Sequence, residues 1–245
     1  MNKINVFGCP MDSSTMEETV DWIADRVERR VFTQHVVVNA AKLVHMQSNP
    51  DLASSVRNCD IINIDGMGVV WGARLLGNHV PERVSGVDLF YKLVEMARER
   101  RIPIYLLGAT DAVVEKTVSS LSGQYPGLKV AGFNNGYFWD DEENQVDEIR
   151  RSGARLLFVA ITSPKKEVFI ERWKGRLGVD FVMGVGGTFD VVAGKVRRAP
   201  KWMQRSGLEW FYRVIQEPRR MWKRYLVTNA KFVYMLGKAY LQSRQ

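Results

Sequence analysis

Short apolar segments alternate with longer amphipathic segments along this chain of 245 residues, and this alternation constrains the fold more than any other feature. Apolar runs typical of buried strands occupy residues 4–7, 35–38, 61–64, 102–107, 129–133, 156–161 and 181–185. Apolar residues at helical spacing occupy residues 15–29, 88–100, 111–124 and 165–177. Strands separated by helices form βαβ units with parallel pairing and right-handed crossovers. The sequence therefore predicts an α/β fold with a doubly wound, mainly parallel sheet.

Positive charge is concentrated at the end of the sequence. The chain has a net charge of +8, but residues 195–245 hold thirteen Lys and Arg against two acidic residues, a net +11, which leaves −3 for residues 1–194. Such asymmetry indicates a part that meets an anionic surface. We therefore expect an α/β domain over residues 1–194 and a basic, amphipathic helical appendage over residues 195–245.

The appendage alternates Trp, Tyr and Phe with Lys and Arg, and its apolar residues recur at helical spacing on both sides of Pro218. This pattern predicts two helices joined at residues 217–218, and it is typical of helices that lie in the headgroup layer of an anionic membrane. The alternative is that the apolar face packs on the α/β domain. Basic aromatic segments also bind nucleic acid, but the chain carries no helix-turn-helix or RNA-binding motif. We expect a membrane surface, and no nucleic acid, as partner.

Composition places the protein in a reducing compartment. Only two cysteines occur, so a disulfide scaffold is disfavoured. The sequence has no secretory signal pattern and no apolar run of about 18 residues. We expect a cytoplasmic protein, peripheral on the inner face of the cell membrane. The acidic run at residues 140–143 suits the first turn of a helix, so no metal is expected, and without a full G-x-G-x-x-G or Walker motif no cofactor is expected either.

Asp65 is the strongest catalytic candidate. It follows the apolar run 61–64 and precedes Gly66, and ligands of open parallel sheets bind outside the carboxyl ends of the strands. A carboxylate at that edge can act as a general base on a hydroxyl group. The alternative is that Asp65 caps the next helix.

Two more polar residues belong to the same edge. Asn39 follows the run 35–38, and its amide can bind a sugar or a uracil base, although capping a helix is the commoner role. Arg83 can bind a diphosphate with two parallel hydrogen bonds, or it can form a surface ion pair with Glu82 or Asp88. Glycines and helix N-termini at several strand ends suit phosphate groups, so the edge is typical of a nucleotide site.

Two motifs around these residues resemble a known family. Asp-Gly-x-Gly-Val-Val at residues 65–70 and Glu-Arg-Val-x-Gly-x-Asp-Leu at residues 82–89 resemble the signature of the WecG/TagA/CpsF glycosyltransferases. The resemblance implies a Rossmann-like fold and metal-independent, inverting transfer of a sugar from a UDP-sugar donor to a polyprenyl-diphosphate-linked sugar acceptor. Asp65 would be the catalytic base, with Asn39 and Arg83 binding substrate.

Later motifs extend the resemblance. Residues 162–167 resemble the family's Gly/Ser-x-Pro-Lys-Gln-Glu, which makes Lys166 and Glu167 substrate-binding candidates. Lys166 stands where Gln is usual, and we expect this cation to favour an acidic donor such as a uronic acid. In Gly-Val-Gly-Gly-Thr-Phe-Asp at residues 184–190, Gly186 and Gly187 allow the backbone to approach a ligand. Asp190 can hold a ribose or sugar hydroxyl, or it can pair with a nearby arginine.

The resemblance also gives the appendage a role at the site. Arg213 and Arg220 would contact the diphosphate of the donor or the acceptor. An appendage that docks only at the membrane would leave an apolar surface in solution, so a homo-oligomer is an expectation. Two other classes remain as alternatives, a nucleotide-binding oxidoreductase and a non-catalytic nucleotide-binding protein of the membrane surface.

Overall fold

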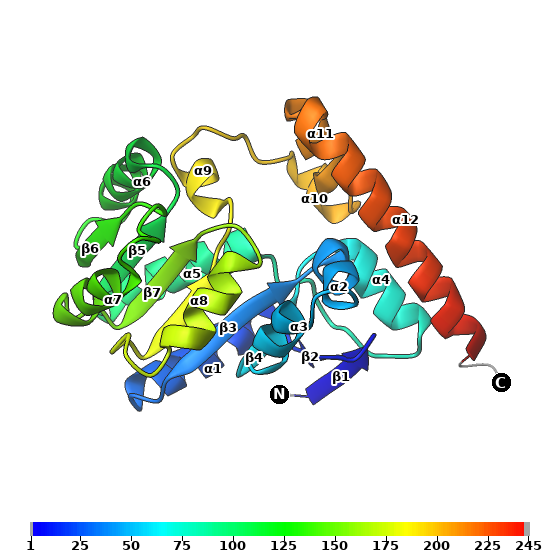
Figure 1. Ribbon diagram of the computed structural model, residues 1–245, viewed down its shortest axis with the longest axis horizontal. Coiled ribbons are helices and arrows are strands. Elements are labelled where there is room, and N and C mark those ends of the chain that lie inside the picture. The colour runs from blue at the N-terminus through cyan, green and yellow to red at the C-terminus, as the bar shows by residue number, and fades with distance from the viewer. Residues whose placement is uncertain (1, 243–245) are drawn as a thin grey trace.

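An eight-stranded sheet forms the centre of the molecule (Figure 1). The computed structural model describes residues 2–242, apart from the side chain of Arg220. The strand order is β1-β2-β4-β3-β8-β7-β5-β6, with β1 and β2 antiparallel and every other pair parallel. The strands are β1 (Asn2–Val6), β2 (Cys9–Ser13), β3 (Thr33–Val38), β4 (Ile61–Ile64), β5 (Ile104–Gly108), β6 (Val130–Asn134), β7 (Leu156–Ala160) and β8 (Phe181–Gly184).

Helices cover both faces of the sheet, which confirms the predicted doubly wound α/β fold. One face packs against α1 (Met16–Glu28), α5 (Gly86–Glu99), α6 (Asp111–Gln124) and α9 (Thr188–Val192). The other face packs against α2 (Ala40–Met46), α3 (Pro50–Arg57), α4 (Met67–Leu75), α7 (Glu142–Arg151) and α8 (Lys165–Trp173). Alternate residues of β5, β7 and β8 point to opposite faces, as the period of a strand requires.

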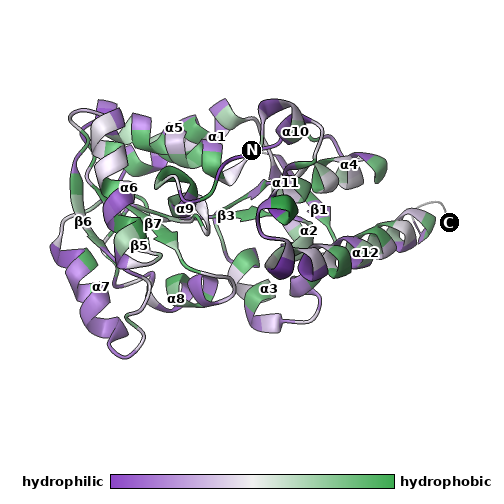
Figure 2. Ribbon diagram, turned by 90° about the horizontal axis from the view of Figure 1, so that it is seen from above, coloured by the Kyte–Doolittle hydropathy of each residue, from purple (hydrophilic) through white to green (hydrophobic). Residues whose placement is uncertain are grey.

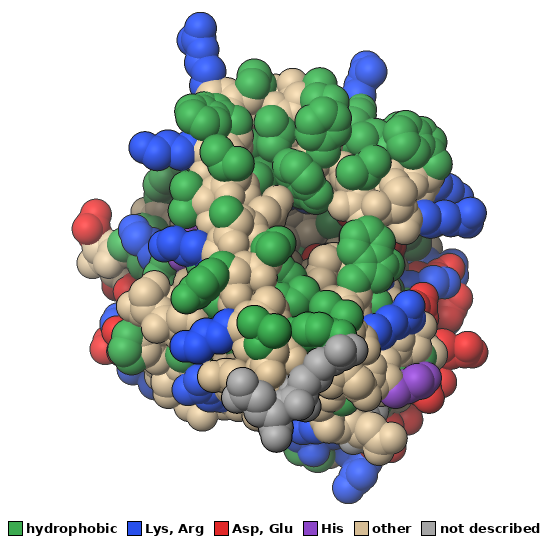
Figure 3. Space-filling view, turned by 90° about the vertical axis from the view of Figure 1, so that its right-hand side faces the viewer, with side chains coloured by type: hydrophobic (Ala, Val, Ile, Leu, Met, Phe, Trp, Pro, Cys, Tyr) green, Lys and Arg blue, Asp and Glu red, His purple; other side chains and the backbone are tan. Residues whose placement is uncertain are grey.

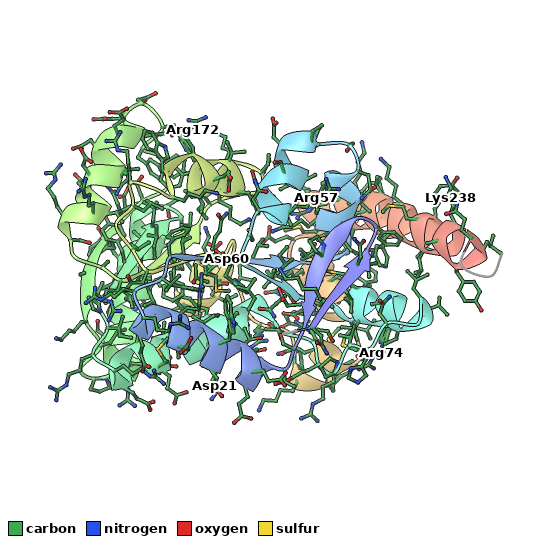
Figure 4. All side chains as sticks on the ribbon, turned by 90° about the horizontal axis from the view of Figure 1, so that it is seen from below. Asp21, Arg57, Asp60, Arg74, Arg172 and Lys238 are labelled. Carbon is green, nitrogen blue, oxygen red and sulfur yellow. The ribbon has the colours of Figure 1, made fainter. Side chains whose placement is uncertain are left out.

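The hairpin of β1 and β2 differs from the prediction, which had a single strand at residues 4–7. The chain reverses through Phe7 and Gly8, both at positive φ, and β2 then pairs with β4. Asp12 of β2 is buried, and its Oδ2 accepts a hydrogen bond from the backbone N of Ile62 at 2.8 Å, which offsets the cost of burial. The side chain of Arg57 on α3 reaches this hairpin, where Nε donates to the carbonyl oxygen of Gly8 at 2.8 Å (Figure 4). The hairpin therefore extends the sheet at one edge.

The C-terminal segment folds as α10 (Lys201–Arg205), α11 (Glu209–Gln216) and α12 (Pro218–Gln242). The two helices predicted on either side of residues 217–218 are present, and α10 is an addition. The long α12 lies against α2 (Figure 1), and its Phe232 is buried edge-on against Phe7 with ring centroids 5.8 Å apart. Part of the apolar face of the appendage thus packs on the α/β body. Within residues 2–242, no helix is both long enough and apolar enough to cross a membrane.

Candidate active site

A cavity of about 500 Å³ opens at the carboxyl ends of β3 and β4. Residues of α2 and α4 form one wall and residues of α11 and α12 form the other. Hydrophobic side chains surround a hollow on this side of the molecule, with Lys and Arg at the periphery (Figure 3). The polar lining residues are Asn39, Asp65, Arg83, Ser85, Glu209, Arg213, Arg224, Tyr225 and Asn229. The site is therefore assembled from the α/β body and the appendage together.

Asp65 lies in this cavity with a quarter of its side chain exposed. Its backbone N donates to the carbonyl oxygen of Val38 at 2.8 Å, which extends the β3–β4 pairing by one residue. Its Oδ1 accepts from Arg83 Nε at 3.2 Å, and its Oδ2 accepts from the backbone N of Gly86 at 3.4 Å. The alternative that Asp65 caps the next helix is wrong, because the N-cap of α4 is Gly66 and the helix has no side-chain cap. The carboxylate is held in place and partly open to a ligand.

Arg83 joins the body to the appendage. Besides Asp65, its guanidinium donates to Glu209 Oε2 at 2.6 Å and to the carbonyl oxygen of Gln204 at 3.2 Å. Only 13% of the Arg83 side chain is exposed, and although burial opposes its charge, the carboxylates of Asp65 and Glu209 raise the pKa of Arg83. The predicted alternative of a surface pair with Glu82 or Asp88 is wrong. Arg83 instead shares its charge between two carboxylates on opposite walls of the cavity.

Asn39 caps a helix, the commoner of the two roles that the sequence left open. Its Oδ1 caps α2 by accepting from the backbone N of Lys42 at 3.0 Å, and the residue also lines the cavity. The amide nitrogen donates no hydrogen bond to the part of the chain that the structure describes. The capping bond fixes the side chain while two N–H donors remain for a ligand.

Arg213 and Arg224 supply positive charge to the cavity. Neither has an ion-pair partner among the described side chains, in contrast to Arg83. Arg220 belongs to α12, but its side chain lies outside the described residues. Sequence reasoning did not single out Arg224, although its position four residues after Arg220 places both on one face of a helix. Two unpaired guanidinium groups in one cavity suit a ligand with a doubly charged diphosphate.

Lys166 and Glu167 lie outside the lining of this cavity and are buried, next to the largely covered side chain of Lys42. Glu167 Oε1 accepts from Lys42 Nζ at 2.9 Å and lies 3.0 Å from Lys166 Nζ. Burial opposes the ionisation of Glu167, but the two ammonium groups hold its pKa down at about 2. Burial and the charge of Lys42 lower the pKa of Lys166 to about 8. The stem of Lys166 packs against Gly184, where a Cβ atom would lie 2.8 Å from Lys166 Cε.

Gly186, Gly187 and Asp190 follow β8 at the same edge of the sheet, outside the lining of the cavity. Gly186 adopts a φ of 53°, and Gly187 is the N-cap of α9. Asp190 Oδ1 lies 3.3 Å from Lys195 Nζ, so the predicted arginine partner is wrong. Because β3 lies between β4 and β8, these residues are separated from Asp65 by one strand.

Sequence comparison identifies the family of the chain. The profile of the Glycosyl transferase WecG/TagA/CpsF family matches residues 4–245. The chain belongs to this family. It is 33% identical over 227 residues, 92% of this chain and 88% of the relative, to the N-acetylglucosaminyldiphosphoundecaprenol N-acetyl-beta-D-mannosaminyltransferase of Bacillus subtilis (strain 168). It is 35% identical over 178 residues, 73% of this chain and 68% of the relative, to the enzyme of the same name from Bacillus spizizenii.

Membership in the WecG/TagA/CpsF family makes the protein a glycosyltransferase, as the motifs at residues 65–70 and 82–89 predicted. The cavity brings together Asn39, Asp65, Arg83 and Arg213 of the predicted residues. It adds Glu209, Arg224, Tyr225 and Asn229, which the sequence did not indicate. These four belong to the appendage, whose side chains meet the strand ends only in the folded chain.

Proposed function

We propose that this glycosyltransferase moves a sugar from a UDP-sugar, of the N-acetylhexosamine or uronic-acid type, to a polyprenyl-diphosphate-linked sugar. The observation that carries the proposal is one cavity that holds a partly exposed carboxylate, Asp65, and two unpaired arginines, Arg213 and Arg224. The relatives' names specify an N-acetylglucosaminyl diphosphoundecaprenol acceptor and an N-acetylmannosaminyl group transferred to it. Such an acceptor carries a sugar hydroxyl, which a base must deprotonate, and a diphosphate, which positive charge must bind.

The residues of the cavity support transfer in a single displacement. Asp65 takes the proton of the acceptor hydroxyl while the hydroxyl oxygen bonds to the anomeric carbon of the donor. The bond from that carbon to the phosphate oxygen breaks on the opposite face, so the anomeric configuration inverts and UDP leaves. Arg213 stabilises the charge on the departing diphosphate of UDP without a metal ion, which leaves Arg224 on α12 for the diphosphate of the acceptor. Arg83 already binds two carboxylates, so its part is to orient Asp65 rather than to bind UDP.

We also propose that the protein works at the inner face of the cell membrane, with residues 195–245 as the contact. The appendage is strongly basic, and it presents exposed apolar side chains, among them Trp202, Phe211, Trp222 and Leu226. Hydrophilic and hydrophobic residues alternate along α12 (Figure 2). Basic residues near an anionic leaflet contribute about 1 kcal/mol each. Flotation with anionic vesicles, compared with neutral vesicles, tests this contact.

UDP release tests the proposed reaction. The purified protein is mixed with a panel of UDP-sugars and a short-chain polyprenyl-diphosphate-GlcNAc in the presence of EDTA, and we expect release from one donor that depends on the acceptor. The variant Asp65→Asn should bind UDP with unchanged affinity and melt at the same temperature, but turn over at least about 100-fold more slowly. Turnover within a few fold of the parent enzyme would remove Asp65 from the role of base. If no donor in the panel gives acceptor-dependent release of UDP, the proposed reaction is overturned.

A further inference from the structure

The cavity continues beyond its polar part as an apolar groove between α4 and α12. Residues Trp71, Gly72 and Leu75 of α4 line one side, and Phe232, Val233 and Leu236 of α12 line the other. The two helices approach closely at Gly72, where a Cβ atom would lie 3.3 Å from Phe232 Cζ and 3.4 Å from Leu236 Cδ1. The remote end of α4 is fixed by Arg74, which donates to the carbonyl oxygen of Val80 at 2.7 Å (Figure 4). The groove therefore has two fixed helical walls.

The polarity of the cavity changes in one direction along α12. Arg224 and Tyr225 lie near the start of the lining, Asn229 follows, and the last lining residues are apolar. From Arg224 to Leu236 the helix rises by about 18 Å. Trp71, Leu75 and Val233 are exposed by 51%, 52% and 65% although they line a cavity. Apolar side chains gathered beside unpaired arginines suit a ligand whose diphosphate is joined directly to a hydrocarbon chain.

We infer that this groove, defined by Trp71, Gly72, Leu75, Phe232, Val233 and Leu236, binds the first isoprene units of the lipid-linked acceptor. The inference rests on the proposed function, and it assigns a subsite to the part of the acceptor that does not react. With the diphosphate of the acceptor at Arg224, its sugar lies on the side of Asp65 and its hydrocarbon chain on the side of Leu236. Burial of methylene groups in the groove adds affinity for a lipid-linked acceptor over a soluble sugar diphosphate.

Acceptors that differ only in their tails test the groove. GlcNAc diphosphates with a geranyl or a geranylgeranyl tail are compared below their micelle concentrations, without detergent or vesicles. We expect a KM at least about tenfold lower for the longer tail, because the added methylene groups leave water on binding. Equal KM values for the two tails would overturn the inference. So would a preference for the longer tail that appears only when vesicles are added, because the membrane would then be its cause.

A pair of neighbouring substitutions separates the groove from the rest of α12. Val233→Asp places a charge in the groove, whereas Tyr234→Asp places the same charge on the adjacent, 73% exposed residue outside it. We expect Val233→Asp to abolish most of the tail preference and Tyr234→Asp to retain both the preference and the activity. Leu75→Asp changes the opposite wall and should act as Val233→Asp does. If Val233→Asp and Tyr234→Asp behave alike, the groove does not bind the tail.

Binding without turnover keeps this test independent of the reaction. Geranylgeranyl diphosphate and inorganic diphosphate are titrated against the full chain by calorimetry. The groove predicts that the lipid diphosphate binds at least about tenfold more tightly, and that Val233→Asp reduces this ratio while Tyr234→Asp does not. Equal affinities would overturn the groove. If this preference is present but no acceptor supports UDP release, the groove stands and the proposed reaction fails.

Discussion

The bridge from Asp65 through Arg83 to Glu209 leads to a prediction about catalysis. The variant Glu209→Gln keeps the shape of the side chain but removes its charge, so Arg83 is left with Asp65 as its one close carboxylate. The undivided positive charge then stabilises the ionised form of Asp65 and makes it a weaker base. Glu209 acts here through Arg83, as a positioning residue rather than a group that touches substrate.

The structure gives the size of this effect. The Arg83–Glu209 contact is 2.6 Å long, with 13% and 17% of the two side chains exposed. Two unit charges about 4 Å apart interact by roughly 4 kcal/mol at an effective dielectric constant near 20, and a hydrogen bond to a charged group contributes about 1.5–3 kcal/mol net of desolvation. We take about 2 kcal/mol as the most that the loss of this contact can add to the reaction barrier, which corresponds to at most about 30-fold in rate.

Steady-state kinetics as a function of pH measure this effect. For Glu209→Gln we expect kcat at neutral pH to fall by up to about 30-fold, and the acid limb of its pH profile to move to lower pH. Glu209→Asp keeps the charge and should recover part of the rate, and Glu115→Gln, an exposed residue on α6, should match the parent enzyme. A purely structural role for Glu209 would lower the melting temperature and leave the profile in place. A Glu209→Gln enzyme within twofold of the parent across the pH range would refute the reasoning.

Two further predictions concern stability. Gly108 has a φ of 125°, and a Cβ atom there would lie 2.5 Å from the carbonyl oxygen of Ala160. The variant Gly108→Ala should therefore lower the free energy of unfolding, measured by urea denaturation, by at least about 2 kcal/mol. The control Gly123→Ala, in open space on α6, should be neutral or stabilising. Burial lowers the pKa of His35 from its ordinary value of 6.5 to about 4. Between these two pH values the unfolded chain binds a proton that the folded chain does not. The free energy of unfolding should therefore decrease as the pH is lowered through this window, and it should be about 2 kcal/mol smaller at pH 5 than at pH 8. A His35→Gln variant with the same pH dependence would contradict this origin.

The sequence predicts the strands best where burial is complete. Residues 61–64 were predicted with the bounds that β4 has, because three of the four are isoleucine and all four are buried; the polar Asn63 is buried with hydrogen bonds to Ser14 and Thr19. The strand β2 (Cys9–Ser13) was not predicted because Pro10 and Asp12 interrupt its apolar pattern. Asp12 is tolerated in the sheet because a backbone N–H of β4 satisfies it, and that partner lies 50 residues away. A local pattern holds no information about such a partner.

The candidate site was predictable only on the side of the body. Asp65 follows from its place at the end of a strand, and Asn39 follows in the same way. Glu209 lies 126 residues from Arg83 in the sequence, so spacing gives no sign that the two meet. A lysine in the first turn of a helix indicates an exposed cation, but Lys166 is buried because Glu167 neutralises it inside the protein.

The two walls of the cavity are made at different times. The wall of α2 and α4 belongs to the first third of the chain, whereas α11 and α12 follow all eight strands. As the polypeptide leaves the ribosome, the sheet and Asp65 can assemble before Arg213, Arg224 and Glu209 exist. A chain that stops before α11 presents a carboxylate at an open sheet edge with neither Arg213 nor Arg224 beside it. Interrupted synthesis should therefore yield inert protein rather than an enzyme that wastes its sugar donor on water.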